Sequence, residues 1–108
     1  MPFVAGSLAD GQLPSSAGDL YTAPADTVVY VKRISFFNTN SVEQTIIIWV
    51  QRSGGTARKW RQYVLAQNES ADLLEGGDAL HLSEGDKIRA QSTTNNVVDY
   101  FITGVSES

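Results

Sequence analysis

Short segments of alternating apolar and polar residues, separated at regular intervals by turn-forming residues, run along the sequence from Leu20 onward. The segments are rich in valine, isoleucine, threonine and aromatic residues, which favour β-strands. The breaks between them read APAD, TNS, SGGT, QNE, EGGD, SEG and TTNN. This pattern predicts an all-β protein with strands near Leu20–Ala23, Thr27–Asn38, Glu43–Arg52, Arg58–Ala66, Ser70–Leu74, Leu80–Leu82, Asp86–Ser92 and Val97–Val105.

A chain of 108 residues has the length of one domain. We therefore expect a single antiparallel β-sandwich, of jelly-roll or immunoglobulin-like type, over residues 20–108. No window combines apolar residues at helical spacing with a capping residue at its start. Only the segment ARKWRQYVLAQ, residues 57–67, could be either a helix or a strand.

Two of the expected strands carry further detail. In TVVYVKRISFFNT the apolar alternation changes phase, because Val29 and Val31 are odd-numbered while Ile34 and Phe36 are even-numbered. One extra residue, a β-bulge at the change, would keep all four side chains on one face. The segment TIIIWVQ is apolar on both faces, which predicts a central strand covered on both sides or one whose outer face meets another chain.

The first 19 residues differ from the rest of the chain in composition. They mix glycine, serine, alanine, aspartate and proline with four isolated large apolar residues. This composition favours an extended arm over a packed element. Such an arm could lie on a neighbouring molecule, or it could be a frayed terminus. The apolar residues that would make the contact are Phe3, Val4, Leu8 and Leu13.

Composition excludes several classes of function. The net charge of −4 argues against a nucleic-acid partner, because proteins that bind a phosphate backbone usually carry a net basic face. The absence of cysteine removes disulfides, thiol nucleophiles and thiolate metal sites. No run approaches the ~18 apolar residues of a membrane span, and the first residues lack the pattern of a secretion signal. The default expectation is synthesis in the cytoplasm with no membrane partner.

The segment HLSEGDKIRAQST, residues 81–93, holds the single histidine and two acids and is the natural place to look for chemistry. The residues around Gly85 are those that form tight turns, and apolar alternation resumes on either side, so we expect a turn with His81 pointing away from the core. No G-x-S-x-G motif presents a nucleophile. Glu84 and Asp86 lack the spacing of a calcium loop, so a metal ion there would need remote ligands. We expect neither an enzyme nor a cofactor.

Half of the basic residues lie within ten positions around SGGT, interleaved with aromatic residues. Basic residues beside aromatics can form an interface or bind a glycan or nucleic acid. The alternative is a solvated hairpin with one buried tryptophan. The residues concerned are Arg52, Arg58, Lys59, Trp60, Arg61 and Tyr63.

Five segments together resemble small β-sandwich virion proteins of tailed bacteriophages: LYTAPA (20–25), VVYVKRISFFNT (28–39), TIIIWV (45–50), LHLSEGDKIRAQST (80–93) and VVDYFITGVSE (97–107). They cover most of the chain after the first 19 residues. The chain departs from the family pattern at Asp26, where glycine is common, and in the arginine-rich hairpin around Trp60. These departures concern the partner surface.

The resemblance implies a non-enzymatic structural protein of the virion. The first expectation is a capsid cement or decoration protein, on the capsid exterior, that binds between major capsid proteins and stabilises the shell, as a homotrimer. The alternatives are a tail, neck or fibre-base component, or a glycan- or receptor-binding module that uses Trp60 and Tyr63. Besides the apolar residues of the arm and the basic hairpin residues named above, the expected partner interface includes Trp49.

Overall fold

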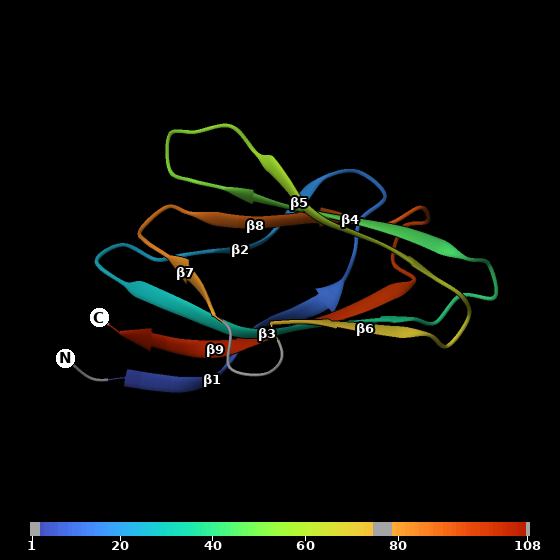
Figure 1. Cartoon of the computed structure of the whole chain (residues 1–108), viewed down its shortest axis with the longest axis horizontal. Coiled ribbons are helices and arrows are strands. Elements are labelled where there is room, and N and C mark those ends of the chain that lie inside the picture. The colour runs from blue at the N-terminus through green and yellow to red at the C-terminus, as the bar shows by residue number, and fades with distance from the viewer. Residues whose placement is uncertain (1–2, 75–78, 108) are drawn as a thin grey trace.

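The computed structural model describes residues 3–74 and 79–107, and the regular structure in these ranges is all β-strand. Two antiparallel sheets pack face to face (Figure 1). Sheet A has the order β1-β9-β3-β6, with β7 also paired to β3, and sheet B has the order β2-β8-β4-β5. The strands are β1 (Phe3–Gln12), β2 (Gly18–Thr22), β3 (Val28–Asn38), β4 (Gln44–Gln51), β5 (Arg58–Leu65), β6 (Ser70–Leu73), β7 (Leu80–Leu82), β8 (Lys87–Gln91) and β9 (Val98–Glu107).

The order of the strands is that of a jelly roll. The chain passes from β1 in sheet A to β2 in sheet B, returns to sheet A at β3 and crosses again at β4, so that it wraps around one core. The predicted antiparallel sandwich is confirmed, and its topology corresponds to the jelly-roll alternative. Each of the eight expected strands is present with its ends within two residues of the expected ones. The turn expected at EGGD, residues 75–78, lies outside the described residues.

The core lies between the inner faces of the two sheets. It is built from the alternate residues of each strand, as the period of two requires. The largest apolar side chains in it are less than 2% exposed. They are Leu13, Val29, Val31, Ile34, Phe36, Ile46, Ile48, Leu82, Ile88, Val98 and Ile102.

Strand β3 contains the predicted β-bulge. Its register against β9 shifts between Val31 and Arg33, so Lys32 is the additional residue. The side chains on both sides of the shift are buried in the core, as expected. Opposite the bulge stands Gly104, where a Cβ atom would lie 2.2 Å from the Tyr30 carbonyl oxygen. Only glycine fits this position, because the contact is with backbone that cannot move aside.

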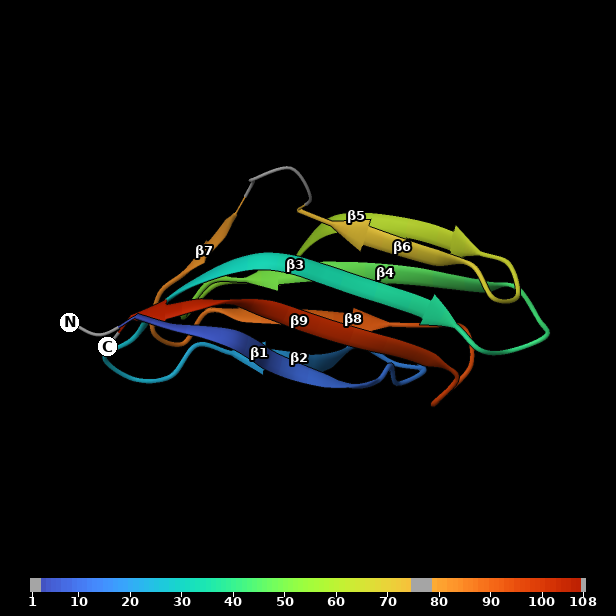
Figure 2. The same cartoon turned by 90° about the horizontal axis from the view of Figure 1, so that it is seen from below.

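The N-terminal segment is a strand of the sandwich and not an arm outside it. Residues 3–12 form β1, which pairs with β9 along its whole length at one edge of sheet A (Figure 2). Leu13 is fully buried in the core, and Leu8 is partly buried against it. The sandwich therefore begins at Phe3 and not at residue 20. Spaced apolar residues suit this strand because only one of its two faces is turned toward the core.

Strands β4 and β5 form a hairpin in sheet B, which resolves the helix-or-strand ambiguity of residues 57–67 in favour of a strand. β4 lies between β8 and β5, so it is central in its sheet, but its outward-facing side chains Ile47 and Trp49 are only half-buried. Cover on both faces is therefore not seen in the described residues, and an outer face that meets another chain stays a prediction. The register of the hairpin shifts at Trp60, which has no residue of β4 opposite it. Beyond this bulge the pairing continues, with Trp49 opposite Lys59 and Val50 opposite Arg58.

Candidate functional surfaces

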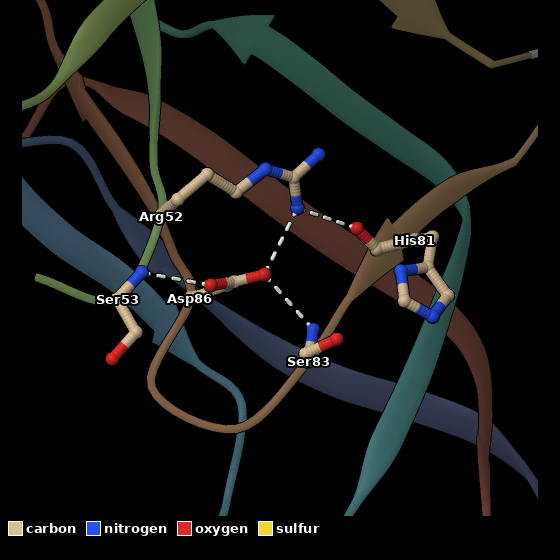
Figure 3. A network of polar contacts seen from close by, with 5 residues as sticks. All are labelled: Arg52, Ser53, His81, Ser83 and Asp86. Atoms are coloured by element: carbon tan, nitrogen blue, oxygen red, sulfur yellow. Dashed lines mark hydrogen bonds and ion pairs between the residues drawn. The ribbon is translucent and has the colours of Figure 1, made fainter. Parts of the chain in front are cut away.

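The turn at Ser83–Asp86 is held by a buried carboxylate (Figure 3). Asp86 is 6% exposed. Its Oδ2 accepts hydrogen bonds from the Ser83 backbone N–H (2.9 Å) and from Arg52 Nη1 (3.0 Å). Its Oδ1 accepts one from the Ser53 backbone N–H (2.8 Å). Arg52 Nη1 also donates to the carbonyl oxygen of His81 (2.7 Å). We call these five residues the Asp86 network.

The electrostatics of Asp86 follow from these contacts. Burial raises the pKa of its carboxyl, but the hydrogen bonds from Ser83 and Ser53 and the positive charge of Arg52 outweigh burial and hold the pKa below its ordinary value. The carboxylate is thus ionised at neutral pH and has three donors. A group in this state joins two loops that are far apart in sequence and is not available as a proton donor.

His81 shows no catalytic arrangement. Its side chain is exposed, as predicted, and its ring packs edge-on against Tyr30 at a centroid distance of 5.4 Å. Within the described ranges no acid hydrogen-bonds to the imidazole, and no group of three or more histidine and acidic residues could hold a metal ion. Glu84, the second acid of the turn, accepts a hydrogen bond from the Asp26 backbone N–H (2.8 Å). The side chains of Glu84 and Asp86 thus both accept hydrogen bonds from backbone N–H groups of neighbouring loops and turns.

Asp26, the departure from the phage pattern, has a structural explanation. Its φ of +57° lies in the left-handed region, where glycine is most common and aspartate is tolerated. The hydrogen bond that it donates to Glu84 joins its turn to the Ser83–Asp86 turn. The backbone conformation and the hydrogen bond of Asp26 thus both belong to the turn.

The basic hairpin borders a cavity that is open to solvent. Its volume is about 400 Å³, and it lies where the β4–β5 loop faces β7. Four of the predicted interface residues line it, and they are Arg52, Arg58, Lys59 and Trp60. The other lining residues are Val50, Gly55, Thr56 and Leu80. We call this the hairpin cavity.

The remaining predicted interface residues lie elsewhere. Arg61 stacks on Trp60, with its guanidinium carbon 5.0 Å from the ring centroid. Tyr63 is paired with Ile46 and is partly buried against the core. Trp49 follows the buried Ile48 and lies half-buried on the outer face of sheet B. The side chains of Phe3 and Val4 lie outside what the structure describes.

Sequence reasoning missed the exposed aromatic residues of sheet A. Phe37 in β3 is 39% exposed and Phe101 in β9 is 54% exposed. Phe101 is paired with Ser35, two residues before Phe37, so the two rings are diagonal neighbours on one face. Diagonal neighbours lie ~7–8 Å apart, within reach of aromatic side chains. Alternation was the available signal, because it places the residue after the buried Phe36 outside.

This outer face has a polar border. Arg33 and Asp72 form an ion pair at 3.1 Å on one side of the two rings. On the other side, Gln12 Nε2 donates a hydrogen bond to Asp99 Oδ1 (3.1 Å). Apolar rings surrounded by polar groups are the usual composition of a protein–protein contact.

In the described ranges, no helix is long and apolar enough to cross a membrane.

The comparisons with known proteins identify a fold and no family. No protein-family model and no curated protein matches the sequence. The chain is similar to a solved structure of Bacillus endospore appendages, described as disulfide-linked pili, with a TM-score of 0.54 and 17% identity over 98% of this chain and 88% of that one. Weaker likenesses are to PirA (TM-score 0.43, 17% identity, 96% and 89%) and to infectious bursal disease virus, Gt strain (0.35, 10%, 97% and 32%). At such identities the first likeness shows a shared β-sandwich fold.

Proposed function

We propose that the chain is a non-enzymatic structural protein that binds other proteins of a particle through the outer face of sheet A. The observation that carries the proposal is the exposed pair Phe37 and Phe101. Aromatic side chains are enriched at the centres of protein interfaces, where they bury a large area at a low entropic cost. The polar groups around them would form the rim of the contact. The buried Asp86, by contrast, holds a turn.

The particle that we propose is a phage virion, with the chain as a capsid decoration protein on the capsid exterior. The sequence resemblance supports this role, and so does a jelly-roll domain small enough to sit between major capsid proteins. We propose a homotrimer as the assembled form. A tail, neck or fibre-base position uses the same fold against a different partner. A specific contact usually buries roughly 1,200–2,000 Å² in total, which is more than two rings can supply, so neighbouring residues of β1, β3 and β9 would take part.

The experiment is a binding assay with purified particles that lack this protein. Wild type and the variant Phe101→Ser are added back, and bound copies are counted against the major capsid protein by quantitative mass spectrometry. Val64→Ser is the matched control, because Val64 is similarly exposed (52%) but lies in β5 of the other sheet. We expect a fixed ratio for wild type and control and a loss of binding for Phe101→Ser. Equal binding by all three would refute the proposed face, and a few copies per particle would favour the tail or neck.

A second candidate is an appendage subunit that polymerises with itself. It is favoured by strand β1, which is ten residues long and has no described strand on its outer side. A long unpaired edge can accept a strand from another chain. The similarity to the endospore appendages extends over nearly the whole chain. Since the 108 residues contain no cysteine, the links could not be disulfides. Electron microscopy of the purified protein distinguishes the candidates: fibres unaffected by reductant favour the appendage, and discrete trimers favour the decoration protein.

A further inference from the structure

The hairpin cavity combines an apolar surface with positive charge. Its apolar part comes from Val50 at the end of β4, Leu80 in β7 and the indole ring of Trp60. Its volume of about 400 Å³ lies near the lower end of the ~300–1,000 Å³ typical of ligand sites. A cavity of this size suits a ligand of one or two small rings. In Figure 1 the loop of the β4–β5 hairpin projects from the upper sheet.

The charge of the cavity is positive and only partly balanced. Arg52, Arg58 and Lys59 line it, and none of the described residues that line it is acidic. Arg52 is paired with Asp86. Arg58 makes no hydrogen bond or ion pair with any residue in the described ranges, and the Lys59 ammonium contacts only the neutral side chain of Gln62. The balance is therefore two positive charges on a chain whose net charge is −4. Such a local excess attracts an anion that the rest of the surface repels.

The walls are preformed. Gly55 N–H donates to the Arg52 carbonyl (2.8 Å), and Gln51 Nε2 donates to the Gly55 carbonyl (3.1 Å), which closes the loop on itself. Asp86 also holds the start of this loop, because its carboxylate accepts hydrogen bonds from the Arg52 side chain and from the Ser53 backbone N–H. A site that is already ordered loses little conformational entropy when a ligand binds.

These features narrow the chemistry of the ligand. A purely aliphatic molecule would gain nothing from two unpaired cations, and a polynucleotide would be repelled by the net charge of the chain. A sugar ring has an apolar face that packs on an indole, and its hydroxyls can bond to Thr56 and to the loop backbone. A carboxylate on that ring is matched by the guanidinium of Arg58, whose planar fork binds carboxylates with two parallel hydrogen bonds.

We propose that the hairpin cavity binds an acidic sugar, of one or two rings and carrying a carboxylate, with Trp60 as the stacking surface and Arg58 as the charge partner. This inference goes beyond the structural role proposed above and does not depend on it. It would give a particle or appendage built from this chain an affinity for acidic polysaccharides on a surface. The lining of the hairpin cavity includes neither Phe37 nor Phe101 of sheet A, so one chain could make both contacts.

The test is an NMR titration of the full-length protein with three small probes. Glucuronic acid carries both the ring and the charge, glucose carries the ring alone, and acetate carries the charge alone. The chain has two tryptophans, which gives two indole N–H signals. Trp60 reports on the cavity, while Trp49, on the outer face of sheet B, is an internal control. We expect glucuronic acid alone to shift the Trp60 signal with saturation.

Two variants complete the design. Arg58→Gln should raise the Kd of glucuronic acid roughly tenfold or more, the usual effect of losing a hydrogen bond to a charged group. Lys32→Gln, which removes an exposed cation of β3, should leave the Kd unchanged. Neither residue is in the core, so both variants are expected to fold. A Trp60 signal that stays unmoved, that moves equally with glucose, or that responds unchanged in Arg58→Gln would overturn the proposal.

Discussion

The Asp86 network allows a quantitative prediction for Asp86→Asn. An asparagine side chain has the same shape but keeps one acceptor oxygen and presents an NH₂ group in place of the other. With its oxygen toward Ser83 and Arg52, it faces the Ser53 N–H with a donor; turned the other way, it leaves Ser83 and Arg52 without an acceptor. In either orientation at least one backbone N–H loses its partner.

The size of the effect follows from these contacts. An unsatisfied N–H costs about 1–3 kcal/mol, and the loss of charge assistance on the remaining bonds adds about 1 kcal/mol. The contact with Arg52 adds little, because that side chain is 55% exposed and an exposed pair is screened. We therefore expect Asp86→Asn to lower the free energy of unfolding by about 2–4 kcal/mol.

The assay is equilibrium unfolding in urea, followed by tryptophan fluorescence. With an m-value in the ordinary range, the midpoint should fall by roughly 1–2 M without a change in slope. Glu84→Gln is the control on the same turn, because glutamine keeps the acceptor for the Asp26 N–H. Its midpoint should stay close to that of wild type. If Asp86→Asn also unfolds at the wild-type midpoint, the buried carboxylate does not hold the turn and the reasoning fails.

Three further predictions concern pH and packing. The pKa of Asp86 lies below its ordinary value of 3.8, so its ionised form stabilises the fold above that pH. This contribution is lost as the pH falls through the folded-state pKa. In urea titrations at acid pH, the difference in unfolding free energy between wild type and Asp86→Asn should therefore shrink. Burial raises the pKa of Tyr21, and burial together with the charge of Asp10 raises that of Tyr100, so their neutral forms stabilise the fold up to pH 10 and that stability is lost as the pH rises through the folded-state values. In a spectrophotometric titration, Tyr21→Phe and Tyr100→Phe should each remove a phenol that ionises above pH 10, and a late phase that neither variant reduces would contradict this. Gly104→Ala should lower the free energy of unfolding by at least about 2 kcal/mol, since its Cβ would overlap the Tyr30 carbonyl oxygen; thermal unfolding at the wild-type temperature would show that the backbone can adjust.

The success of sequence reasoning depended on how local each signal was. The bulge at Lys32 was predictable because the change of phase between Val31 and Ile34 is written in adjacent residues. The turn that carries Gly85 was predictable for the same reason. Alternation also predicts the outward position of Phe37, because that residue follows the inward-facing Phe36.

Long-range partners could not be predicted in the same way. Nothing near Asp86 in the sequence indicates that its donors come from Arg52 and Ser53, more than thirty residues earlier. The composition of residues 1–19 suits both a free arm and an edge strand, and only the pairing with β9 separates them. The bulge at Trp60 determines which side chains of the basic hairpin line the cavity, which pack against the core and which lie on the outer face. The local sequence pattern does not indicate this bulge.

The position of β9 has a consequence for how the molecule is made. This strand, the last of the nine along the chain, lies between β1 and β3 in the middle of sheet A. While a ribosome is still adding residues 98–107, β1 therefore has no neighbour to pair with, and the first half of the sandwich stays open. Such non-local pairing makes folding slow and leaves strand edges exposed to other nascent chains. We expect the domain to fold only after synthesis has passed Glu107, and truncation before Val98 to yield an aggregating product.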